Sequence, residues 1–220
     1  MFIAPDSMHI PTQSPNLDDL GLERLSPDLP AIRTHLNASF PSEVAPNGVE
    51  TWILLEDLNP GQRYEIRVCW LATQPSSFSL STFTLPEVFD HPPLMSSLSE
   101  FSYNRLADLE RQSDPSALIR RPLKSVPEPE SILFLQVITA ADYFTTEKSL
   151  MENPPPVDVD IILDPYLFNV FPRSLVPTAG YILIIALGAW FVSRIIWSGL
   201  ANIAQSSSKA SASSTEKKRS

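Results

Sequence analysis

The 220-residue chain has a single cysteine, Cys69, so it can form no internal disulfide and no metal site built from several cysteines. Because Cys69 lies between Val68 and Trp70, we expect it to be a buried free thiol in a strand. Histidine is also scarce. The three histidines share no metal-ligand spacing with one another or with an acidic cluster: His9, His35 and His91.

Catalytic signatures are absent as well. With only 6 glycines, the chain has no Gly-rich phosphate loop, and it shows no nucleophile elbow and no HExxH motif. Asp158-Val159-Asp160 matches a short pattern that many nucleotide-sugar transferases use for a metal and a diphosphate. No strand-helix-strand unit is predicted before it, so we interpret it as a solvated strand face. The sequence therefore predicts no catalytic, cofactor-binding or metal-binding residues, no cofactor, and a protein that is not an enzyme.

Basic residues are few. The chain has 16 lysines and arginines against 25 acidic residues, a net charge of -9, which argues against nucleic-acid binding. Hydrophobic residues make up 43% of the chain, enough for a core, while 22 prolines disfavour long helices in the soluble part. We therefore expect a mainly β fold.

One segment lacks charge completely. The 20 residues between Arg173 and Arg194 carry none, and as a helix rising about 1.5 Å per residue they would span roughly 30 Å, the hydrocarbon thickness of a bilayer. We predict a transmembrane helix over residues 174–197. Residues 194–220 carry 5 basic and 1 acidic residues, so the positive-inside rule predicts a cytosolic tail over residues 198–220.

The orientation has a second reading. The first 15 residues, MFIAPDSMHIPTQSP, show neither a basic nor an apolar signal-peptide region. Either the true start precedes this sequence, or the chain is a tail-anchored protein facing the cytosol. Against this, Lys217 and Lys218 resemble a dilysine retrieval signal of endoplasmic reticulum proteins, which is read from the cytosolic side. Asn37-Ala38-Ser39 is a glycosylation sequon within the part that would then be luminal, so Asn37 is a candidate glycosylation site.

The soluble region divides by its patterns. We expect an extended or disordered segment over residues 1–30 and a β domain over residues 31–172, with an insertion over residues 86–130. Six strands are predicted, at residues 32–40, 51–55, 64–72, 77–85, 132–139 and 157–163. Within the insertion, apolar residues at helical spacing favour a short helix over residues 95–112.

The run from Leu58 to Val68, LNPGQRYEIRV, resembles the tyrosine-corner segment of fibronectin type III domains. That resemblance implies that the Tyr64 hydroxyl hydrogen-bonds nearby backbone, as a structural corner. Together with the strand count, it predicts an immunoglobulin-like or fibronectin III-like sandwich with a long insertion and one C-terminal transmembrane helix.

Several longer runs resemble the fungal Pga family, the auxiliary subunit of GPI mannosyltransferase II. They are ETWILL at residues 50–55, NPGQRYEIRVCW at 59–70, DYFT at 142–145 and DPYLFNVFP at 164–172. The resemblance implies a single-pass type I protein of the endoplasmic reticulum membrane with a luminal N-terminal domain and a cytosolic C-terminus. It also implies a non-catalytic subunit that supports a multi-pass catalytic mannosyltransferase, which adds the second mannose during GPI-anchor biosynthesis.

Two other functions stay open. The chain could be a tail-anchored, cytosol-facing β-sandwich that serves as a binding module, which fits the absence of a visible signal peptide. It could also be a luminal cargo receptor or chaperone-like receptor. The charge asymmetry across the membrane helix and the dilysine end favour the subunit reading over the cytosol-facing one.

Overall fold

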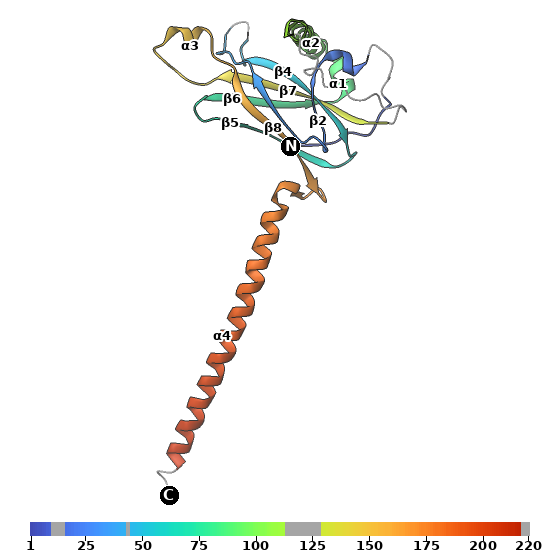
Figure 1. Ribbon diagram of the computed structural model, residues 1–220. Coiled ribbons are helices and arrows are strands. Elements are labelled where there is room, and N and C mark those ends of the chain that lie inside the picture. Colours follow the sequence, from blue (N-terminus) through green and yellow to red (C-terminus); the bar gives the residue numbers. More distant parts are fainter. Residues whose placement is uncertain (10–15, 43–44, 113–128, 217–220) are drawn as a thin grey trace. The chain divides into compact units, whose positions relative to one another are not determined.

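The computed structural model describes residues 1–9, 16–42, 45–112 and 129–216, and the chain forms two compact units, Met1–Arg173 and Ser174–Ser220. The first unit contains two sheets (Figure 1). One has the order β1-β5-β8-β3 with β9 paired to β8, and the other has the order β2-β4-β7-β6. The strands are β1 (Phe2–Ile3), β2 (Glu23–Leu25), β3 (Ala31–Leu36), β4 (Val49–Leu58), β5 (Arg63–Trp70), β6 (Ser76–Phe83), β7 (Ser131–Ala141), β8 (Val157–Leu167) and β9 (Phe171–Pro172).

The two sheets pack face to face through a shared apolar core. Ile53 of β4 and Leu135 of β7 contribute from one sheet, and Tyr64 of β5 and Ile161 of β8 contribute from the other. All four side chains are fully buried. Because successive residues of a strand point to opposite faces, this core uses alternate positions of each strand. The architecture is therefore a β-sandwich built from long-range strand pairs.

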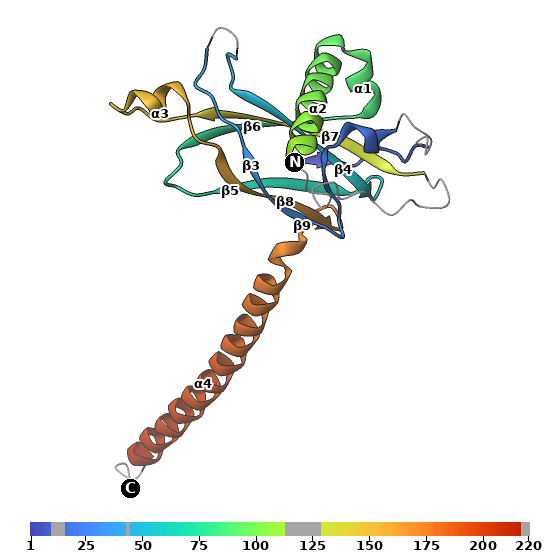
Figure 2. The same cartoon turned by 45° about the horizontal axis from the view of Figure 1, so that its top comes forward.

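Strands β4 and β7 are apolar on their second face as well. Trp52, Leu54 and Phe134 point away from the sandwich core and form a second cluster with Val88 and Leu98. The latter two lie on α1 (Leu85–Asp90) and α2 (Pro92–Gln112), which cover this face of the sheet (Figure 2). A sheet that is buried on both faces explains why these two strands read as continuous hydrophobic runs.

Short helices complete this unit: η1 (Leu17–Leu20) and α3 (Lys148–Glu152). Helix α1 begins with a capping box, in which the Glu87 backbone N–H donates to Thr84 Oγ1 and the Thr84 backbone N–H donates to Glu87 Oε2 at 2.7 Å. The backbone hydrogen bond from Thr84, followed by the one from its hydroxyl, holds the pKa of Glu87 below its ordinary value.

The second unit consists of η2 (Arg173–Leu175), whose first residue closes the β unit, and α4 (Val176–Glu216). Within the described residues, one helix is long and apolar enough to cross a membrane; its span runs from Arg173 to Ala201 with a mean hydropathy of 2.0. The Arg194 guanidinium lies 5.6 Å from the centre of the Trp190 ring. Such a cation–π contact stabilises a charge at the edge of an apolar segment.

Most of the sequence-based predictions about the fold are confirmed. The protein is mainly β with one C-terminal helix able to span a membrane, and each of the six expected strands overlaps a strand of the structure, from β3 to β8. The expected helix over residues 95–112 lies within α2. The immunoglobulin-like or fibronectin-like topology stays a prediction. In this sandwich β2 runs parallel to β4.

Three details differ from expectation. Residues 1–30, expected to be extended or disordered, include β1, η1 and β2, and Leu25 of β2 is fully buried. The last helix continues past residue 197 to Glu216. Cys69 was expected to be buried, which is wrong, because it is exposed. It shares the outer face of β5 with Glu65 and Arg67, since these positions alternate with the core-facing Tyr64.

Candidate functional site

Helix α4 exposes a long run of large apolar side chains. From Tyr181 to Leu200 every large apolar side chain is more than half exposed. An added Cβ at Gly180 or Gly188 would meet no atom within 4 Å. Such a surface suits lipid chains, and small residues let another transmembrane helix approach closely. The helix can therefore serve as an anchor and as a contact surface.

A hydrogen-bonded corner closes one end of the β-sandwich around Tyr64. The Tyr64 hydroxyl accepts the backbone N–H of Asn59 at 3.0 Å and donates to Gln62 Oε1, also at 3.0 Å. The ring is fully buried and stacks on Phe2 of β1, with ring centres 5.7 Å apart. Thus the hydroxyl does contact backbone, and it does so as an acceptor.

The corner is bonded in turn to the hairpin between β8 and β9. Gln62 Nε2 donates to the carbonyl of Tyr166 at 2.9 Å. Asn169 makes two further bonds, because its Oδ1 accepts the backbone N–H of Arg63 at 2.8 Å and its Nδ2 donates to the carbonyl of Gly61 at 2.9 Å. The turn between β4 and β5 and the hairpin before the membrane helix therefore form one hydrogen-bonded group.

The outer face of the β5-β8-β3 sheet carries ion pairs. Arg33 binds Asp160 with two hydrogen bonds, at 2.7 and 2.8 Å, and His35 pairs with Asp158. The hydrogen bonds from Arg33 lower the pKa of Asp160, and the same bonds raise the pKa of Arg33. The two aspartates of the Asp-Val-Asp pattern thus pair with separate residues of β3, on the face expected from the sequence.

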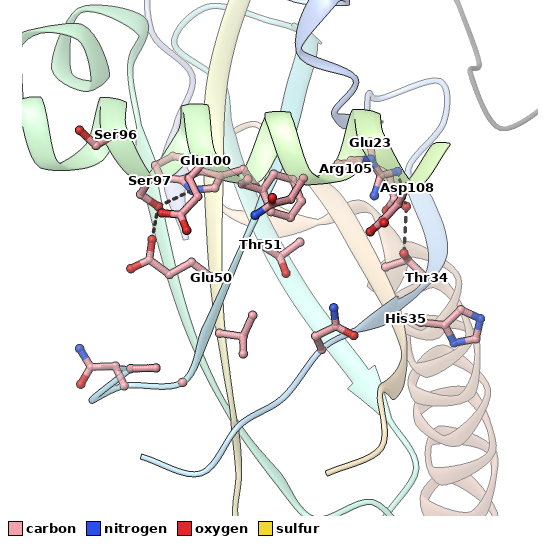
Figure 3. Close-up of a pocket in the computed structure, with 18 of the residues that line it drawn as sticks. Glu23, Thr34, His35, Glu50, Thr51, Ser96, Ser97, Glu100, Arg105 and Asp108 are labelled. Carbon is pink, nitrogen blue, oxygen red and sulfur yellow. Dashed lines mark hydrogen bonds and ion pairs between the residues drawn. The ribbon is translucent and has the colours of Figure 1, made fainter. Parts of the chain in front are cut away.

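A polar groove lies between α2 and the edge of the sandwich (Figure 3). Its volume is about 1040 Å³, and β4, the β3–β4 connection and α2 line it. Trp52 Nε1 donates to Ser97 Oγ at 3.0 Å, and the Ser97 hydroxyl donates to Glu50. At the other end, Arg105 binds Glu23 at 3.0 Å. The groove is rich in acidic and amide side chains.

The polar side chains of the groove are largely bonded to one another. Glu50 accepts a hydrogen bond from Ser97 and Glu23 accepts one from Arg105, so the two carboxylates hold α2 against the strands. In the part of the chain that the structure describes, no group of three or more histidines, cysteines or acidic residues could hold a metal. Asn37, the candidate glycosylation residue, is exposed and lies at the rim of this groove.

Of the candidate site residues that the sequence analysis singled out, the structure describes Tyr64 and Asn37. They lie at different sites, one in the corner and the other at the groove. Lys217 and Lys218 lie outside the described residues. The groove was not predicted. The run 164–172 was singled out by resemblance, but its turn was not predicted, because the positive φ of Phe168 and Asn169, at 52° and 60°, has no signature in the sequence. The sequon of Asn37 stays a prediction.

Comparison with known proteins identifies one family. The model of the Pga1 family, described as GPI-mannosyltransferase II co-activator, matches residues 11–99. This region includes β2 to β6, α1 and most of the Tyr64 corner. We found no significant match to a curated protein or to a solved structure. The family match confirms the resemblance to the Pga family that the sequence predicts.

Proposed function

We propose that the chain is a non-catalytic subunit that supports GPI mannosyltransferase II, the enzyme that adds the second mannose to the GPI precursor. The observation that carries the proposal is the match to a family described as co-activator of that enzyme. A co-activator implies a catalytic partner, and we propose that this partner is a multi-pass membrane protein with which the chain assembles.

The arrangement of the chain supports this role. The β-sandwich is followed by the apolar span found among the described residues, so this span can anchor the sandwich to a membrane. The exposed apolar face of α4, with open space at Gly180 and Gly188, suits contact with a transmembrane helix of the enzyme. The carboxylates of the polar groove hydrogen-bond neighbouring side chains, as structural groups do.

We further propose that the protein resides in the endoplasmic reticulum membrane with its sandwich in the lumen and its C-terminus in the cytosol. The excess of basic residues after the span supports this orientation. A luminal sandwich would expose Asn37 to glycosylation. The tail-anchored alternative places the sandwich in the cytosol, so protease treatment of intact microsomes distinguishes the two: a digested sandwich with a protected C-terminus would contradict our orientation.

Depletion tests the function. Cells without the protein should accumulate a GPI precursor that carries one mannose, because the second transfer fails when its enzyme lacks the subunit. The native protein should also copurify with a multi-pass mannosyltransferase in mild detergent. Normal GPI precursors after depletion, together with no such partner, would overturn the proposal and leave the cargo-receptor and binding-module readings.

A further inference from the structure

The hairpin between β8 and β9 exposes an unusual set of side chains. Leu167, Phe168 and Val170 are exposed to 45%, 90% and 78%. Phe168 sits at the turn with φ of 52°, a backbone conformation that bulky side chains rarely adopt. Glycine or asparagine would fit this position with less strain. The chain therefore presents an apolar side chain to the surroundings where another residue would fold more easily.

The turn is held rigidly. Asn169 also has a positive φ, and its side-chain amide makes two hydrogen bonds to backbone: the oxygen accepts from Arg63 and the nitrogen donates to Gly61. The Val170 backbone N–H donates to the carbonyl of Leu167 at 3.1 Å. These bonds hold the turn in its strained shape, and they leave the three apolar side chains as the free part of the tip. Backbone strain that the surrounding structure maintains is typical of functional sites.

The position of the hairpin along the chain indicates what contacts it. Phe168 precedes Arg173, the first residue of the membrane span, by five residues, and an extended chain of that length covers at most about 18 Å. Arg173 is the only charged residue between Asp164 and Arg194. The tip is thus tied closely to the bilayer surface. Aromatic and aliphatic side chains at that level partition into the interface.

We propose that the tip formed by Leu167, Phe168 and Val170 inserts into the membrane interface and so gives the sandwich a second attachment beside the helix. A protein partner is the competing occupant. A stable protein interface buries about 800 Å² on each side, more than three side chains supply, and its rim is polar. The inference goes beyond the proposed function and holds for either orientation of the span.

The test uses the full-length protein in phosphatidylcholine liposomes. Cys69 is replaced by serine, because its exposed thiol would also react, and a single cysteine is placed at Val170 or, as a matched control, at Phe144. Phe144 is 86% exposed and follows β7. Its chain neighbours Tyr143 and Thr145 line a pocket together with Val157, the first residue of β8, which lies about 33 Å along that strand from the hairpin. Each cysteine carries the environment-sensitive dye NBD, and nitroxide-labelled phosphatidylcholine serves as quencher.

We expect several-fold stronger quenching at position 170 than at position 144. Phe168→Gly should weaken quenching at 170 and, by relieving strain, raise the denaturation midpoint of the sandwich; Phe144→Gly should leave quenching at 170 unchanged. The opposite directions of the two readouts separate lost membrane contact from misfolding. Equal quenching at 170 and 144 would overturn the proposal. So would shielding of position 170 that appears only after the copurified mannosyltransferase is added.

Discussion

At the scale of single residues, the Tyr64 hydroxyl connects three segments. It accepts the backbone N–H of Asn59 and binds Gln62, which in turn binds the carbonyl of Tyr166. We predict that Tyr64→Phe destabilises the sandwich by about 1 to 3 kcal/mol, because it leaves a part-buried N–H without its acceptor. Denaturant unfolding of the two proteins measures this. Equal midpoints would show that water replaces the hydroxyl without cost.

Thr84 and Glu87 form another pair whose effect is measurable at a single group. The backbone N–H of Thr84 is the larger cause of the lowered pKa of Glu87, and the Thr84 hydroxyl is the second cause. We therefore predict that Thr84→Ala, which removes only the hydroxyl, raises this pKa part of the way toward its ordinary value. The stabilisation from this lowered pKa is present above the ordinary pKa of glutamate and is lost as the pH falls through the lowered value. An NMR titration of the Glu87 side chain follows both proteins. An identical pKa in the variant would show that the Thr84 hydroxyl does not bind the Glu87 carboxylate.

At the scale of elements, the connection between β3 and β4 depends on Gly48. Its φ is 110°, and a Cβ built on it would lie 2.3 Å from the carbonyl oxygen of Thr139 in β7. Backbone cannot move aside as a flexible side chain does, so we predict that Gly48→Ala costs about 2 kcal/mol or more. Gly61→Ala is the control, since it shares a positive φ of 74° but meets no atom within 4 Å. Equal losses in the two variants would assign the cost to φ alone.

Some strands could be predicted from the sequence pattern and others could not. Alternation identified β5, and apolar runs identified β4 and β7, because these patterns record burial on one face or on both. The same alternation places Cys69 on the outer face with Glu65 and Arg67, so it predicts the observed exposure. The apolar neighbours Val68 and Trp70 do not indicate burial of Cys69, because they point to the opposite face of the strand. Strand β2 was missed, since three residues in a parallel pair show no period.

The candidate sites were less predictable than the strands. The groove exists because α2 packs against β4 while the β3–β4 connection lies alongside, and this juxtaposition depends on tertiary packing. Similarly, the hairpin tip depends on the backbone of Phe168 and on the two bonds of Asn169. Tyr64 had a local signature, because the Asn-Pro-Gly turn and the tyrosine lie within six residues.

At the scale of the whole molecule, the predicted retrieval signal for the endoplasmic reticulum is the pair Lys217 and Lys218. Replacing Lys217 and Lys218 with serine should let the protein leave the endoplasmic reticulum, because a receptor-read signal is removed while the apolar span is kept. Localisation of an internally tagged protein measures this. Replacing Lys209 with serine is the matched control and should leave residence unchanged. Departure of both variants would indicate that total charge, and not the dilysine pair, retains the protein.

The central place of β8 in its sheet has a consequence for folding during synthesis. It pairs with β5 on one side and β3 on the other. During synthesis β3 and β5 therefore emerge before β8, their partner, which lies roughly one hundred residues further along the chain. Non-local pairing of this kind closes long loops and slows folding. Since β8 is followed almost at once by the membrane span, the sheet can be completed only when that span is itself being made. Completion of the sandwich and integration of its anchor are thus consecutive steps, and until then β3 and β5 lack the strand that pairs with both of them.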